Sequence, residues 1–111
     1  MALQEKQLGQ ARENSTSAVS VYSPASSTTA IIKNIMVTNT SAAAADVSIY
    51  VDDDGTTYDE TTAIMWESEI SAGETITLDS FIAMNDSDGN LAYQSSVANA
   101  LTITVFGAEV T

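Results

Sequence analysis

From Ser17 onward, apolar and polar residues alternate along most of this chain. A period of two is the pattern of half-buried strands, because successive side chains of a strand point to opposite faces of the sheet. Val19 and Val21 open the pattern, and Pro24 predicts its first break, since proline has no N–H to donate to a strand ladder. β-branched residues are frequent at the alternating positions, as they are in strands. The chain is therefore predicted to be a succession of strands.

Longer runs continue this alternation toward the C-terminal end. Residues 28–40 form the longest run and predict a central, buried strand. In each later run the apolar residues share one parity, which predicts the side chains that face inward. These are Val47, Ile49 and Val51; Ile64, Trp66, Ser68 and Ile70; Ile76, Leu78 and Ser80; and Leu101, Ile103 and Val105. The single tryptophan is thus predicted to lie in the core.

Turn-forming residues separate the runs. The acidic stretches at 52–56 and 85–90 predict two turns, and the sequence SAGE at 71–74 predicts a hairpin with Gly73 at a positive φ. Gly107, inside the last run, is interpreted as a bulge. Seven or eight short strands at roughly ten-residue spacing, without a helix-length amphipathic segment, predict an all-β antiparallel sandwich or barrel. A jelly roll and an immunoglobulin-like sandwich both fit, and we take a jelly-roll-like β-sandwich as the predicted fold.

The first residues of the chain differ in composition from the rest. Residues 1–15 are mostly polar, with Leu3 and Leu8 as isolated apolar positions, and Gly9 interrupts any helix that begins there. A length of 111 residues fits one domain with one modest core. We therefore predict an extended N-terminal arm at 1–15 and one β-sandwich domain at 16–111.

The charge of the chain is large and unevenly distributed. The net charge is -12, and Lys6, Arg12 and Lys33 are the only cations. Such an acidic body repels phosphate groups and anionic lipids, so binding to nucleic acid or to a membrane surface is not expected. The chain has no histidine and no cysteine, which removes the commonest general base, the commonest transition-metal ligands and a thiol nucleophile. We expect no enzymatic activity and no cofactor. Lys33, in the central run, is interpreted as a surface lysine whose ammonium reaches solvent or a nearby acid.

Two acidic turns are the candidates for a metal site. Asp52 and Asp54 in one turn, and Asp86 and Asp88 in the other, offer closely spaced carboxylates beside a glycine, as calcium loops do. Both turns lack the full spacing of an EF-hand loop, and we prefer to interpret them as hydrated acids that keep a sheet end from pairing. If the two turns met at one end of the molecule, the two weak sites could act together. A calcium- or carbohydrate-binding module is therefore kept as an alternative function.

Several segments resemble small structural proteins of tailed bacteriophages, which often join an LGQA-like N-terminal segment to a β-sandwich body. The resemblance is carried by LGQAR at Leu8–Arg12, VSVYSP at Val19–Pro24, TTAIIKNIMVTNTS at Thr28–Ser41, SAGETITL at Ser71–Leu78 and ANALTITVFGAEVT at Ala98–Thr111. These segments cover most of the chain. Several virion parts share them, and no catalytic residues come with them.

The resemblance implies a virion structural protein, and within that class a capsid decoration or cement protein that stabilises the assembled shell through contacts made by its arm. Leu3, Leu8 and Arg12 are the expected interface residues, and the major capsid protein or other virion proteins are the expected partners. A homo-oligomer is also expected, with a trimer favoured. A tail, collar or baseplate component is the alternative location. Synthesis is expected in the host cytoplasm, because the N-terminus lacks the apolar stretch of a signal peptide.

Overall fold

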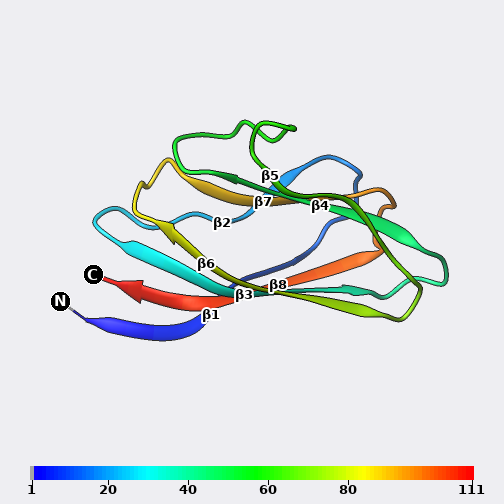
Figure 1. Cartoon of the computed structure of the whole chain (residues 1–111), viewed down its shortest axis with the longest axis horizontal. Coiled ribbons are helices and arrows are strands. Elements are labelled where there is room, and N and C mark those ends of the chain that lie inside the picture. The colour runs from blue at the N-terminus through cyan, green and yellow to red at the C-terminus, as the bar shows by residue number, and fades with distance from the viewer. Residues whose placement is uncertain (1) are drawn as a thin grey trace.

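The computed structural model describes residues 2–111. This part of the chain contains eight antiparallel strands joined by turns and loops (Figure 1). Their bounds are β1 Leu3–Arg12, β2 Val19–Tyr22, β3 Thr29–Asn39, β4 Ala45–Asp52, β5 Ala63–Ile70, β6 Thr75–Met84, β7 Asn90–Ser95 and β8 Leu101–Val110. The strands form two stacked sheets of four. Sheet A has the order β1-β8-β3-β6, and sheet B has the order β2-β7-β4-β5. In this part of the chain no helix is long and apolar enough to cross a membrane.

The strand pairs are nested along the chain. β1 pairs with β8, β2 with β7, β3 with β6 and β4 with β5, so the chain resembles one long hairpin. The pairs β3·β8 and β4·β7 then roll this hairpin into two sheets. This connectivity is that of a jelly roll, and it confirms the predicted fold class. The two ends of the hairpin lie together, since Ala2 and Thr111 exchange two backbone hydrogen bonds of 3.2 and 3.1 Å (Figure 1).

The core lies between the sheets and takes residues from the inner faces of both. Its fully buried aliphatic residues include Ile32, Ile35, Ile103 and Val105 of sheet A, and Val47, Ile49, Ile70 and Leu91 of sheet B. Residues of the edge strand β6, Ile76 and Leu78, pack partly buried against this cluster. The inward faces predicted for the runs that became β4, β6 and β8 are thus confirmed. Burial of these side chains is the main favourable term in folding.

The inward face predicted for the run that became β5 is wrong in its first half, because the strand contains a bulge. Trp66 and Glu67 both lie opposite Ser48 of β4, so β5 has one residue more than its partner at this point, and a further register shift follows at Ile64. An extra residue reverses the inside–outside parity of a strand. Before the bulge, Met65 contacts the core, while Ile64 and Trp66 are each 46% exposed. The tryptophan predicted to lie in the core is therefore on the outer surface of sheet B.

A bulge also interrupts β3. Ile32 and Ile35 are both fully buried although three positions apart, because the register shifts around Lys33. The ammonium of Lys33 points outward and forms an ion pair of 2.8 Å with Glu5, which confirms its interpretation as a surface lysine. Gly107, which the sequence marked as a bulge, keeps a regular partner in both neighbouring strands. The irregularities lie in those neighbours instead.

The N-terminal segment is an edge strand of sheet A. Residues 3–12 of the predicted arm at 1–15 instead pair with β8 as strand β1, with one register shift between Gln7 and Gly9, and Met1 lies outside the described residues. Leu8 and Ala11 pack against the core. This strand was not predicted from its mostly polar sequence, because an edge strand with one solvated face needs only a few apolar residues. Residues 3–12 are thus a strand of the sandwich.

The turn at 71–74 does not form the predicted hairpin. It contains Gly73 at φ 79, as the sequence indicated, but it joins β5 of sheet B to β6 of sheet A. The turn therefore carries the chain from one sheet to the other. The hairpin formed by neighbouring strands of one sheet is β4–β5, and its long loop, residues 53–62, rises above sheet B (Figure 1).

Candidate functional site

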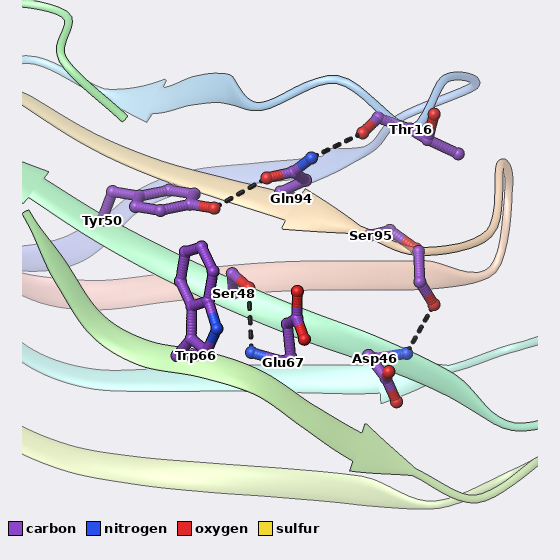
Figure 2. A pocket seen from close by; sticks show the side chains of 9 residues that line it. Thr16, Asp46, Ser48, Tyr50, Trp66, Glu67, Gln94 and Ser95 are labelled. Carbon is purple, nitrogen blue, oxygen red and sulfur yellow. Dashed lines mark hydrogen bonds between the residues drawn. The ribbon is translucent and has the colours of Figure 1, made fainter. Parts of the chain in front are cut away.

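The outer face of sheet B, the side turned away from sheet A, carries a pocket of about 300 Å³. Its lining comes from four segments: Asp46, Ser48 and Tyr50 of β4; Trp66 and Glu67 of β5; Gln94, Ser95 and Ser96 in and after β7; and Thr16 of the β1–β2 linker. Figure 2 shows the Trp66 ring and the Glu67 side chain standing side by side at this pocket. We call it the Trp66 pocket.

The bulge in β5 builds one wall of the Trp66 pocket. In a regular strand, neighbouring residues point to opposite faces, so Trp66 and Glu67 could not both face outward. The bulge brings both side chains to the outer face, and the backbone N–H of Glu67 donates a 2.9 Å hydrogen bond to the Ser48 hydroxyl (Figure 2). Glu67 has a φ of 47°, a left-handed conformation that is uncommon for a residue other than glycine. Backbone strain of this kind is concentrated at functional sites.

Three aromatic rings form the second feature of the pocket. Tyr50 points to the outer face of sheet B yet is only 1% exposed, because the rings of Tyr58 and Trp66 cover it. The Tyr50 ring centre lies 6.1 Å from that of Tyr58 and 6.3 Å from that of Trp66, the latter pair being edge to face. Such pairs add stability beyond the burial of their area. The Trp66 ring is thereby held in place while nearly half of it stays accessible.

Hydrogen bonds fix the floor of the pocket. The Tyr50 hydroxyl donates to Gln94 Oε1 at 2.7 Å, and Gln94 Nε2 donates to the carbonyl oxygen of Thr16 at 3.0 Å (Figure 2). The Ser96 hydroxyl accepts a bond of 2.8 Å from the backbone N–H of Asp46. The amide and hydroxyl groups of the floor are therefore engaged with the protein. The pocket is preorganised rather than assembled by a ligand.

The charged groups of the pocket are different, because they are unpaired acids. Within residues 2–111, the carboxylates of Asp46 and Glu67 make no hydrogen bond or ion pair with the protein. Glu69, on the same strand as Glu67, is the register partner of Asp46. Like charges directly opposite each other on one sheet face repel. The fold thus holds acids close together at this pocket without a cation of its own.

The charges of the chain are distributed unevenly between sheet A and the rest of the molecule. All three cations lie on strands of sheet A, together with three acids, Glu5, Asp79 and Glu109, so these strands are neutral in sum. The other twelve acids carry the whole net charge of -12: four lie on strands of sheet B, and eight lie in the connections. The strands of sheet B therefore have a net charge of -4 that no cation on them offsets.

Sheet A uses its acids in pairs. Glu109 accepts a hydrogen bond from the Tyr22 hydroxyl of sheet B and pairs with Lys6 at 2.9 Å. These two contacts, the Tyr22 hydrogen bond first, lower the pKa of the Glu109 carboxyl, while burial and the same carboxylate raise the pKa of Tyr22. The outer face of this sheet also exposes Phe81, which is 76% exposed, and Phe106. Sheet A therefore presents a neutral surface with apolar side chains.

The two acidic turns proposed for calcium do meet at one end of the sandwich. Asn90 Nδ2 donates to the Gly55 carbonyl oxygen at 2.8 Å and so joins the turns. Asp52 and Asp86, however, accept hydrogen bonds from backbone N–H groups of their own turns, as capping acids do. In the described residues, no group of three or more acidic side chains is arranged to hold a metal ion.

The predicted interface residues are separated by the structure. Leu3 is 66% exposed near the N-terminal end of β1, and Arg12 is exposed at the other end of that strand. Leu8 is half-buried and packs against the core, so its main contact is within the molecule. The Trp66 pocket could not be predicted from the sequence, because it is assembled from four segments around a bulge. Its one signal was an aromatic residue next to an acid, Trp66–Glu67.

No protein-family model and no curated protein matches this chain in sequence. Among solved structures, the chain is similar to a chain in the structure of infectious bursal disease virus, Gx strain. The two superpose with a TM-score of 0.56 at 12% sequence identity. The similarity covers 97% of this chain but only 32% of the viral chain, so this protein spans about a third of the length of its structural neighbour. At this identity the likeness shows the fold alone.

Proposed function

We propose that this protein is a structural component of a virus particle, and more narrowly a decoration or cement protein on the capsid of a tailed bacteriophage. The observation that carries the proposal is the jelly-roll connectivity over nearly the whole chain, which is similar in fold to a chain of a virus structure. Jelly rolls also occur in lectins and cupins, so the fold alone does not specify the role. The resemblance of several segments to phage structural proteins supports the particle assignment.

The surface of sheet A suits the contact with an assembled shell. Its strands have no net charge, and Met36, Phe81 and Phe106 are exposed on them. The outer face is otherwise covered by cross-strand polar pairs such as Asn34–Asp79, at 2.7 Å. A neutral surface with a few large apolar groups has the composition of a protein–protein interface. Sheet B, whose strands carry four acids and no cation, would face the solvent.

The edge strand β1 would make the contacts with the shell that were predicted for the N-terminal arm. Leu3 and Arg12 are exposed along it, and its outer edge has unpaired backbone groups. An exposed strand edge can pair with another chain, either the major capsid protein or a second copy of this protein. Contacts of modest size become strong when they are repeated over a lattice. A homo-oligomer, with a trimer favoured, belongs to this proposal.

Localisation on intact particles tests the proposal. Cryo-electron microscopy of the phage should show density of this shape over the capsid lattice, and density confined to the tail, collar or baseplate would instead identify the alternative location. Particles assembled with Phe81→Ser protein should lose copies of it during purification. Glu60→Gln, which changes an exposed loop on the other side, is the matched control and should leave occupancy unchanged. Equal occupancy of both variants would exclude sheet A as the contact surface.

A further inference from the structure

We propose that the Trp66 pocket binds the side chain of an arginine residue that a protein partner presents to it. The inference rests on the pocket itself and does not depend on a role in a virus particle. Its elements are an accessible indole ring, unpaired carboxylates beside that ring, and a volume that fits one side chain.

The pocket offers both kinds of contact that a guanidinium makes, an indole ring and carboxylates. A planar guanidinium stacks on an indole face and pairs with carboxylates through its N–H groups, and tryptophan is the best aromatic partner for a cation. The bulge puts Trp66 and Glu67 on the same face at adjacent positions, so one group can contact both (Figure 2). Asp46 lies on the neighbouring strand and lines the same pocket. The aromatic contacts to Tyr50 hold the indole in place before a ligand arrives.

The charges at the pocket favour a cation. Asp46 and Glu69 face each other as register partners, and Glu67 lies two positions along the same strand. Repulsion among these acids falls when a positive group binds between them. No lysine or arginine lies on any strand of sheet B or in its loops, so the protein does not supply that group from this side. The field of the four acids on the strands of sheet B also steers a basic partner toward this sheet.

The same contacts disfavour the other ligand classes. A neutral sugar could stack on the indole and use the hydroxyl groups of the pocket, but it would leave the charges of Asp46, Glu67 and Glu69 uncompensated. A metal ion needs more ligands than the two carboxylates that line the pocket, and no metal-binding cluster is present in residues 2–111. A volume of about 300 Å³ is at the lower limit of ligand pockets and holds one side chain. An anion would be repelled.

Peptide titration of the whole chain tests this inference. The probes are a capped Gly-Arg-Gly peptide and its citrulline analogue, which has nearly the same shape but no charge. Since Trp66 is the only tryptophan, its fluorescence reports on the pocket directly. We expect saturable binding of the arginine peptide, weakened by added salt, and at least about fivefold weaker binding of the citrulline peptide.

Variants locate the binding. Glu67→Gln should weaken arginine binding by about fivefold, and Trp66→Leu, followed by NMR shifts, by about tenfold. Glu74→Gln removes the same charge from an exposed turn outside the pocket and should leave the affinity within a factor of two of the wild type. All three substitutions are at surface positions, and circular dichroism confirms that the fold is kept. Equal binding of both peptides, binding of a neutral sugar but not of arginine, or equal losses in Glu67→Gln and Glu74→Gln would each overturn the inference.

Discussion

A single methyl group placed at Gly107 should separate the two central strands of sheet A. Gly107 lies in β8 opposite Ile32 of β3, with no space on its side-chain side. A Cβ there would be 2.1 Å from the carbonyl oxygen of Ile31 and 2.9 Å from Leu8 Cδ1. The Leu8 side chain can rotate, but the carbonyl oxygen belongs to the backbone of the neighbouring strand. Gly107→Ala therefore requires β3 and β8 to move apart.

The size of this effect follows from the contact distances. Ordinary contacts of a Cβ begin at 3.4 Å, so the strands must open by about 1.3 Å at this point. Opening of that size breaks about two ladder hydrogen bonds at ~1 kcal/mol each and adds ~2 kcal/mol of overpacking strain. The lower entropy of the unfolded alanine chain returns ~0.7 kcal/mol. We expect a net loss of about 3 kcal/mol, which is a large part of the ~5–15 kcal/mol that stabilises a typical domain.

Urea denaturation followed by circular dichroism measures this loss. Gly55→Ala is the matched control, because its Cβ would meet only the Asp52 side chain at 3.3 Å, and a side chain can move. The control should lie within ~1 kcal/mol of the wild type, since it has the same unfolded-state change without a backbone clash. If Gly107→Ala matched Gly55→Ala at an unchanged denaturant slope, the close approach of β3 and β8 would be refuted.

Three further perturbations test the architecture. Trp66→Ala should lower the free energy of unfolding by about 2 kcal/mol, less than for a buried tryptophan, because nearly half of the residue is exposed. Urea titration measures this loss, and a loss above ~4 kcal/mol would put Trp66 in the core. Deletion of residues 2–12 should lower the free energy of unfolding by ~3 kcal/mol or more, since β1 covers the edge of β8 and adds to the core; a deletion protein that melts at the wild-type temperature would contradict this. Glu109 has a folded pKa below its ordinary 4.5, so its contribution to stability is present above pH 4.5 and is lost as the pH falls through the folded value. Glu109→Gln should therefore flatten the loss of stability in acid, and an acid profile identical to the wild type would show that the bonds to Tyr22 and Lys6 are not formed in solution.

The alternation of residues was enough to predict strands, but not to follow them through a bulge. In the run that became β5, Ile64, Trp66 and Ile70 have the same parity. No residue type in this run indicates the extra residue at Glu67. The bulge is set by pairing with β4, where the Ser48 hydroxyl receives the displaced N–H. Parity is a local property of one strand, whereas register belongs to a pair of strands.

The turn at 71–74 shows the same difference between local and long-range information. The sequence at 71–74 correctly predicted a reversal with Gly73 at a positive φ. Whether a reversal stays in one sheet depends on which distant strand lies beside it, and β6 lies beside β3 rather than β5. For the same reason the Trp66 pocket could not be predicted, because its floor joins Gln94 to Thr16, 78 positions away. Local patterns predict elements, and long-range pairing decides what they build.

The nested pairing also sets an order in which the fold can form. The pair β4·β5 closes only the loop of residues 53–62, while β1·β8 joins the two ends of the chain. The entropic cost of closing a loop rises with the length of the loop, but each inner strand pair brings the next two strands together. We expect the sandwich to zip outward from β4·β5, slowly, as folds dominated by distant contacts do. The outermost strand, β1, would then dock last and open first, and its amides should be the earliest in the sheets to exchange with deuterium.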